Sequence, residues 1–173
     1  MKILVTGGSG YIGTSLVPAL LGKNHKVIVL DNLMYDQNVL LEHYINPNFS
    51  FVYGDIRDRK VVQDLVEQSD AVIHLASIVG APACKKNETL AKEVNVDGTK
   101  NVIDFISNDQ ILLFASTGSV YGKIEGMCDE DWEPNPLSLY GSTKLEGELM
   151  ALNLPNSVAF RFATAYGLSP RLR

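Results

Sequence analysis

The sequence predicts an α/β protein whose core is one doubly wound parallel β-sheet of about six strands, with helices on both faces. Short apolar runs bounded by turn residues recur along the chain. They are near-continuous rather than alternating, which is typical of strands covered on both faces. The stretches between them are long enough for helices, and alternation of strand and helix favours a parallel sheet. With 173 residues and 46% hydrophobic composition, the chain is expected to form a single domain, residues 1–173.

The expected elements follow from these runs in chain order. The apolar runs predict strands at 2–7, 26–31, 49–55, 71–77, 111–116 and 157–163. The sequence between them predicts helices at 11–22, 58–68, 89–107 and 140–152.

Local signals bear on where these elements begin and end. Gly22 is a stop signal for the first helix, and Asp58 is an expected N-cap for the second. Pro18 lacks a backbone N–H inside the first predicted helix and is expected to kink or shorten it. The longest irregular stretch, 122–139, carries acidic residues and two prolines, and we interpret it as a surface loop that covers a site.

Composition limits the classes of partner. The net charge is −5 and the pI about 5.1, which argues against a basic footprint for nucleic acid or an anionic membrane. Cys84 and Cys128 lie far apart without metal-ligand spacing, so we interpret them as free thiols of a reducing compartment and expect no metal site. We identify neither a secretory signal nor an apolar run long enough to span a membrane, and therefore expect a cytoplasmic protein.

A glycine-rich stretch, TGGSGYIG, directly follows the first predicted strand. Its glycines at 7, 10 and 13 precede a predicted helix. Glycine permits a tight turn in which backbone N–H groups and a helix N-terminus approach a pyrophosphate. By itself the pattern is equally compatible with a flexible turn. However, the second strand ends at Asp31, whose carboxylate is suited to bind both ribose hydroxyls and to repel a 2′-phosphate. The combination predicts a dinucleotide site that prefers NAD to NADP.

The stretch LYGSTKLEG places Tyr140 four residues before Lys144, which puts both side chains on one helix face. A phenol with a pKa of about 10 is a poor base at neutral pH. An ammonium about 4 Å away stabilises the phenolate by up to about 4 kcal/mol at an effective dielectric constant of about 20, or roughly 3 pKa units. The alternative is two ordinary residues on a helix surface. Hydroxyls in FASTGSVYG, after the fifth strand, either orient such a base or cap the backbone.

Taken in order, TGGSGYIG, VLDN, GDIRD, VIHLAS, FASTGSVYG, YGSTK and RFATAYG resemble the extended short-chain dehydrogenase/reductase family, in its sugar-nucleotide epimerase and dehydratase branch. The resemblance spans nearly the whole chain and implies a Rossmann-type fold with NAD as cofactor. The residues that it assigns to the cofactor are Gly7, Gly10, Tyr11, Ile12 and Gly13 for the pyrophosphate; Asp31, Asn32 and Leu33 for the adenosine ribose; Asp55 and Ile56 for the adenine; and Leu75, Ala76, Ser77 and Asn95 toward the nicotinamide. We interpret His74, within VIHLAS, as structural.

The resemblance also implies a catalytic set of Tyr140, Lys144 and Thr117, with Ser116 as the nearest rival of Thr117. In this mechanism Tyr140 takes a proton from a sugar hydroxyl, Thr117 binds its oxygen, and Lys144 binds the cofactor ribose as well as lowering the pKa of Tyr140. Dehydratases and decarboxylases of the family carry carboxylates directly after the threonine position. Here Gly118 and Ser119 stand there, which favours a 4-epimerase-like enzyme or a simple oxidoreductase.

Departures from the family pattern leave the substrate open. Thr164 and Val79 stand where many members carry an asparagine and a lysine. Family members are also longer, so the chain is expected to be the cofactor half, without the small domain that binds the nucleotide sugar. The hypotheses are therefore an epimerase lacking that domain or a non-catalytic, regulatory NAD-binding module. The resemblance implies a homodimer through a four-helix bundle of 89–107 and 140–152, whose apolar residues intramolecular packing also explains.

Overall fold

The computed structural model describes residues 1–171. Six parallel strands form one sheet in the order β3-β2-β1-β4-β5-β6, which confirms the predicted fold class. The strands are β1 (Lys2–Thr6), β2 (Lys26–Asp31), β3 (Phe49–Tyr53), β4 (Ala71–His74), β5 (Ile111–Thr117) and β6 (Ser157–Phe162). The strand order reverses direction between β1 and β4. Ligands of open parallel sheets bind at such a switch point, beyond the carboxyl ends of the strands.

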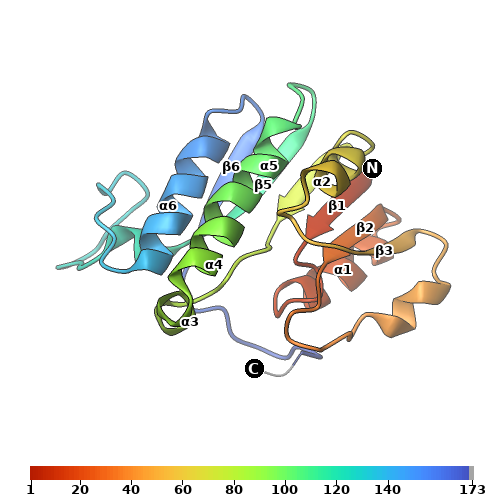
Figure 1. The fold of residues 1–173 in the computed structure, drawn as a ribbon, viewed down its shortest axis with the longest axis horizontal. Helices are drawn as coiled ribbons and strands as arrows, with labels where there is room; N and C mark the ends of the chain where they lie inside the picture. The colour runs from red at the N-terminus through yellow and green to blue at the C-terminus, as the bar shows by residue number, and fades with distance from the viewer. Residues whose placement is uncertain (172–173) are drawn as a thin grey trace.

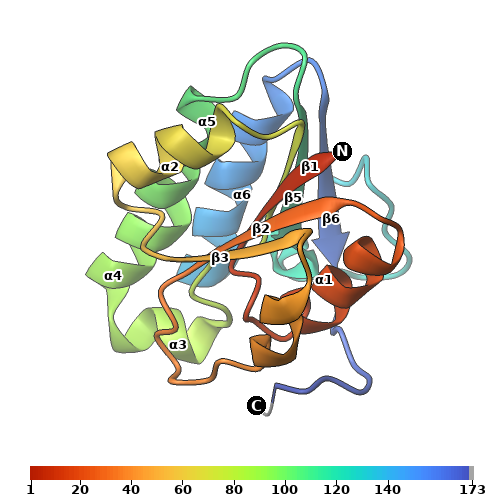
Figure 2. The same ribbon diagram turned by 90° about the vertical axis from the view of Figure 1, so that its right-hand side faces the viewer.

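Helices connect the strands and cover the sheet unequally. They are α1 (Gly13–Gly22), α2 (Arg59–Val66), α3 (Ala81–Lys86), α4 (Glu88–Lys92), α5 (Thr99–Asp104) and α6 (Leu139–Leu152), with short 3₁₀ helices η1 (Leu41–Ile45) and η3 (Gly118–Tyr121) and a π-helical segment η2 (Glu93–Gly98). Figure 2 shows α2, α4, α5 and α6 on one face of the sheet and α1 on the other. Two apolar clusters, one on each face, form the core.

Strand β6 departs from the expected burial. Its residues alternate between partly buried and exposed, and Val158, Phe160 and Phe162 are each at least 40% exposed. These side chains lie on the face opposite α6, which packs against β5 and β6. The prediction that every strand is covered on both faces is therefore wrong for β6 in residues 1–171, because the apolar cluster on the α1 face reaches β4 and Leu113 of β5 but includes no residue of β6.

The helix predicted at 89–107 is present as one unbroken run from Glu88 to Asp104 (Figure 1), in which the π-helical segment η2 lies between α4 and α5. Thr99, the residue that follows the π segment, donates its Oγ1 hydroxyl to the carbonyl of Asn95 within that segment at 2.7 Å. A side-chain hydroxyl that occupies a helix carbonyl competes with the regular backbone ladder, which gives a physical reason for the irregular turn.

Of the residues expected to mark helix ends, Asp58 acts as predicted and Pro18 does not. Asp58 accepts from the backbone N–H groups of Lys60 and Val61, so it is the N-cap of α2, as predicted. Pro18 does not end α1, which continues to Gly22. Its missing N–H therefore costs one backbone bond without shortening the helix. No helix among residues 1–171 is long and apolar enough to cross a membrane.

Candidate cofactor and proton-transfer site

The glycine loop lies between β1 and α1 and packs tightly against neighbouring backbone. Gly7 has φ 69°, and a Cβ there would lie 2.6 Å from the backbone nitrogen of Ala76. A Cβ on Gly13 would lie 2.3 Å from the carbonyl oxygen of Gly8. Gly10 closes the turn by donating its N–H to the carbonyl of Gly7 at 3.0 Å. The tight turn expected from the sequence is thus present, and it brings the loop against the residues that follow β4.

The same loop carries a buried hydroxyl that has no partner among the described residues. Ser9 is 4% exposed, and its Oγ makes no hydrogen bond there. It lies just before Tyr11 and Ile12, which lead into the N-terminus of α1. An orphaned hydroxyl beside a helix N-terminus fits an anionic ligand such as a pyrophosphate, because both supply hydrogen-bond donors and the helix dipole favours negative charge.

Asp31, the last residue of β2, joins this loop to the next one. Its Oδ2 accepts from the N–H of Ser9 at 2.9 Å, and its Oδ1 accepts from the N–H of Leu33 at 2.8 Å. Leu33 has φ 52°, a left-handed conformation that is costly for leucine and persists only where the surrounding contacts fix the turn. The carboxylate is therefore held at the edge of the glycine loop, where the sequence predicts a ribose contact.

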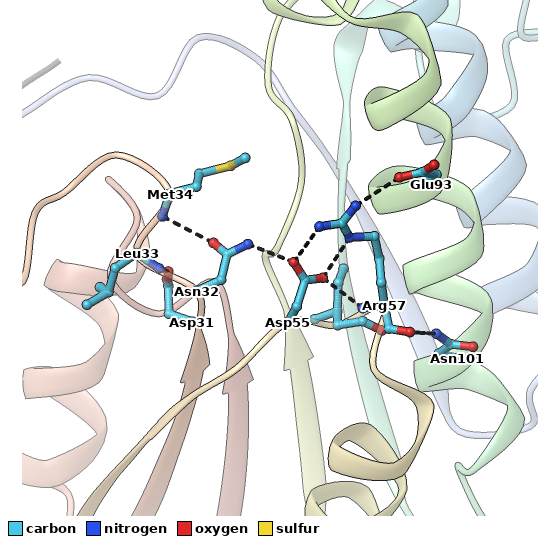
Figure 3. A network of polar contacts seen from close by, with 9 residues as sticks. Asp31, Asn32, Leu33, Met34, Asp55, Arg57, Glu93 and Asn101 are labelled. Carbon is cyan, nitrogen blue, oxygen red and sulfur yellow. Dashed lines mark hydrogen bonds and ion pairs between the residues drawn. The ribbon is translucent and has the colours of Figure 1, made fainter.

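A polar network joins the loops after β2 and β3 to the helical face (Figure 3). Asn32 Nδ2 donates to Asp55 Oδ2 at 2.9 Å, and Arg57 donates to both oxygens of Asp55 and to Glu93. Hydrogen bonding from Arg57 lowers the pKa of Asp55 to about 2, despite partial burial. Both Asp55 oxygens are thus occupied within the chain. Ile56, the other predicted adenine residue, is buried beneath this network.

The segment after β4 lies beside the glycine loop. Leu75 donates its N–H to the carbonyl of Thr6, and Ala76 donates to the Thr6 hydroxyl at 3.3 Å. Asn95 is fully buried, and its amide bonds with the backbone of residue 78, with Ser77 Oγ and with Thr143 Oγ1. Asn95 therefore lies behind Ser77 and fixes the segment that the sequence assigns to the cofactor channel.

His74 is part of the core, as its structural interpretation expects. Its Nδ1 lies 2.6 Å from Thr6 Oγ1 and its Nε2 lies 2.9 Å from Thr99 Oγ1. Because Thr99 donates to the carbonyl of Asn95, it accepts from His74, which indicates the Nε2–H tautomer. Burial, followed by the nearby charge of Lys144, lowers the pKa of His74 to about 3.

Thr117 and the first turn of α6 meet at the carboxyl end of β5. Thr117 ends β5, and its Oγ1 accepts from the N–H of Ser119 at 3.2 Å. Ser138 caps α6 by accepting from the N–H of Gly141 at 3.1 Å. A Cβ on Gly141 would lie 2.7 Å from the carbonyl oxygen of Ser119. The glycine after Tyr140 thus lets α6 start in contact with the segment that follows Thr117.

Lys144 lies one turn after Tyr140 and is almost completely buried, with 2% of its surface exposed. Its Nζ lies 4.2 Å from the centre of the Phe114 ring, where the π face stabilises a cation. Burial lowers the pKa of Lys144 to about 7, and Glu148 opposes that change. Tyr140 is partly buried against the same core cluster. The two residues thus lie one turn apart on α6, which is the helix placement that the sequence predicts for them.

Two residues that the sequence reasoning missed adjoin this pair. Glu148 is 1% exposed, and its Oε1 accepts from Arg161 Nε at 3.0 Å and Nη2 at 2.7 Å. Its Oε2 accepts from Ser116 Oγ. The spacing from Lys144 to Glu148 is again four residues, a signal that was available in the sequence. The bond from Ser116 to Glu148 engages the rival hydroxyl, which favours Thr117 in the catalytic role.

The last described segment crosses to the glycine loop. Tyr11 donates its hydroxyl to the carbonyl of Gly167 at 2.6 Å, and Ser169 Oγ lies 2.9 Å from Thr14 Oγ1. The guanidinium of Arg171 lies 4.6 Å from the centre of the Tyr35 ring. Residues after β6 therefore pack on the N-terminal turn of α1, as Figure 1 shows by the course of the blue segment.

Gly13→Ala should lower the free energy of unfolding by about 1 to 3 kcal/mol, because the methyl group would enter the space of the Gly8 backbone. Gly22→Ala is the matched control, since nothing lies within 4 Å of a Cβ at the end of the same helix. We expect it to be neutral or stabilising by up to about 1 kcal/mol. Urea unfolding of the three proteins measures both effects, and equal stabilities for the two variants would contradict the tight loop.

The fold and site define a Rossmann-type domain with a glycine loop, a carboxylate after the second strand and a Tyr-x3-Lys helix. The model of the NAD dependent epimerase/dehydratase family matches residues 3–169. The chain belongs to this family, a branch of the extended short-chain dehydrogenases/reductases.

Relatives and solved structures agree with this membership. A putative UDP-glucose 4-epimerase of Methanocaldococcus jannaschii is 36% identical over 84% of this chain, and a dTDP-glucose 4,6-dehydratase of Streptomyces niveus is 36% identical over 88%. The match covers 48% of each relative, so the chain spans about half their length. Among solved structures, the fold is similar to that of a UDP-glucuronic acid 4-epimerase from Bacillus cereus in complex with UDP-glucuronic acid and NAD. The two structures superpose with a TM-score of 0.86 at 31% sequence identity, and the match covers 99% of this chain and 60% of the epimerase chain.

Proposed function

We propose that the chain is the NAD-binding half of a nucleotide-sugar epimerase, which acts through transient oxidation of the sugar to a keto sugar. The observation that carries the proposal is the joint presence of the glycine loop with Asp31 and the Tyr140–Lys144 helix at one edge of the sheet. The orphaned Ser9 hydroxyl supports an anionic ligand in the loop. When bound, NAD supplies a hydride acceptor that later returns the hydride.

The chain's own residues divide the remaining work. The glycine loop and Ser9 bind the pyrophosphate, Asp31 with Asn32 and Leu33 binds the adenosine ribose, and residues 75–77 line the nicotinamide side. Asp55 and Ile56 border the adenine. Asp55 acts indirectly, because its hydrogen bonds fix the loops after β2 and β3 that surround the adenine. Tyr140 removes the proton of the sugar hydroxyl, Thr117 hydrogen-bonds the same oxygen, and Lys144 binds the nicotinamide-side ribose and stabilises the phenolate.

Similarity alone does not choose the reaction, because the epimerase and the dehydratase relatives are equally identical to this chain. Residues Gly118 and Ser119 favour epimerisation, since neither supplies the carboxylate that an elimination requires. A non-catalytic NAD-binding module is the second candidate. We further propose that the protein is cytoplasmic and dimerises through α4–α5 and α6, where Leu149 and Leu152 are at least half exposed.

NAD should bind more tightly than NADP by about 10- to 100-fold, because the Asp31 carboxylate would face the 2′-phosphate. Asp31→Asn should bring the two dissociation constants together, since it removes the charge and keeps one acceptor. Asp36→Asn is the control, an exposed aspartate of the same loop. Calorimetric titration of each protein with both cofactors measures the ratio. Equal affinity of the unmodified chain for NAD and NADP would contradict the role of Asp31.

A further inference from the structure

Glu148 connects three elements at the catalytic end of the sheet. It lies on α6, its carboxylate accepts from Ser116 at the end of β5, and it forms an ion pair at 2.7 Å with Arg161 on β6. Arg161 in turn donates to the carbonyl of Glu130 at 2.9 Å, and its guanidinium lies 4.7 Å from the centre of the Tyr121 ring. A nearly buried carboxylate with all of these partners is fixed in one orientation.

The elements that Glu148 joins carry the proposed catalytic residues. Ser116 directly precedes Thr117, and Lys144 lies one helical turn before Glu148, on the same helix face. The carboxylate therefore fixes the backbone beside Thr117 relative to the helix that carries Tyr140 and Lys144.

Glu148 is also the negative charge near Lys144 in the described part of the chain. The other titratable groups that face this lysine are His74 on β4, Cys84 on α3 and, one turn earlier on α6, Tyr140, while the uncharged Phe114 ring of β5 lies against its Nζ. Burial keeps His74 neutral and raises the pKa of the Cys84 thiol. Near pH 7 the charge that opposes loss of the Lys144 proton therefore comes from Glu148.

We propose that Glu148 is a positioning residue, which locks the ends of β5 and β6 onto α6 and supplies the charge that keeps Lys144 an ammonium beside Tyr140. The catalytic meaning of this inference rests on the proposed function. Its geometry and its test require neither substrate nor cofactor.

The test is the pH titration of Lys144, followed by NMR of the lysine side-chain carbon and nitrogen resonances and assigned with Lys144→Arg. Glu148→Gln should move the midpoint about one pH unit lower, because the attractive charge is lost. Arg161→Gln breaks the same ion pair but leaves the carboxylate. It should move the midpoint higher, because the carboxylate loses its competing cation.

The opposite response of the two variants separates charge from packing. Both should unfold at a lower temperature, since each breaks the buried pair. A purely structural Glu148 would leave the Lys144 midpoint where it is in both variants, or move it equally in both, and either result overturns the proposal. If Glu148→Gln does not fold, Arg161→Gln decides alone, because a midpoint that falls or stays unchanged in this variant also overturns the proposal. If the Lys144 midpoint responds as expected but the unmodified chain turns over no nucleotide sugar, the proposed function fails and the positioning role of Glu148 stands.

Discussion

Tyr140→Phe should reduce turnover of a nucleotide sugar by about 10²- to 10⁴-fold, the usual contribution of a positioned acid–base group. The phenyl ring keeps the apolar contacts that Tyr140 makes with the core cluster, so the effect comes from the missing hydroxyl. The dissociation constant for NAD should stay within about threefold. A single-turnover assay of NAD reduction by UDP-glucose, with calorimetric titration of NAD, measures both.

Tyr44→Phe is the matched control for this prediction. Tyr44 lies in η1, half exposed and packed against Phe49, on the far side of the sheet from α6. Loss of its hydroxyl should leave turnover unchanged. If Tyr140→Phe reduces NAD as fast as the unmodified chain, Tyr140 is not the base. If the unmodified chain binds NAD but does not reduce it in the presence of the sugar, the non-catalytic module becomes the better proposal.

The sheet could be predicted because a strand that is buried on both faces has a continuous run of apolar residues. Val27 to Leu30 and Ala71 to Ile73 are continuous apolar runs, and both are buried in the sheet. Strand β6 shows the limit of that signal. Its sequence, SVAFRF, is apolar enough to indicate a strand, but the run itself does not say which face remains uncovered.

The irregular turn in the helix before β5 could not be predicted, because tertiary contacts accompany it. The stretch between the strands predicted one helix at 89–107, which is present from Glu88 to Asp104, but the π segment in its middle coincides with hydrogen bonds of the Thr99 hydroxyl and of the buried Asn95 amide. The partners of Asn95 lie 17, 18 and 48 residues away. Contacts of that separation have no local pattern from which they could be read.

The position of the candidate site could be predicted from its motifs, but the hydrogen bonds between its residues could not. The sequence located Asp31 and Tyr140 through their distance from the glycine loop and from Lys144. It left Ser116 and Thr117 as rivals, and the two hydroxyls differ only through the Glu148 carboxylate on another element. The network of Asp55 and Arg57 also depends on tertiary contacts, since it joins the loops after β2 and β3 to Glu93 in the π-helical segment.

Lys144→Met should make the protein more stable near pH 7, by on the order of 3 kcal/mol. The pKa of Lys144 falls from 10.5 to about 7 on folding because of burial, and each pH unit between these values corresponds to about 1.4 kcal/mol. Methionine fills a similar volume, packs on Phe114 without a charge and leaves Glu148 paired with Arg161. NAD affinity should fall at the same time, because the proposed ribose contact is lost. Stability and function are thus opposed at this position.

The gain should depend on pH with a definite sign. Below about pH 7 both the folded and the unfolded chain carry a protonated Lys144, so the destabilising contribution of its burial is fully present. Between pH 7 and 10.5 the folded chain loses this proton while the unfolded chain retains it. The stability difference between variant and unmodified chain should therefore shrink across that range in urea unfolding. Lys92→Met, at an exposed lysine, should show no such trend.

The opposite result would be a Lys144→Met protein that is less stable than the unmodified chain at every pH. It would mean that the interactions of the ammonium with Phe114 and Glu148 outweigh the cost of its desolvation. Lys144 would then stabilise the fold in addition to its proposed role in catalysis.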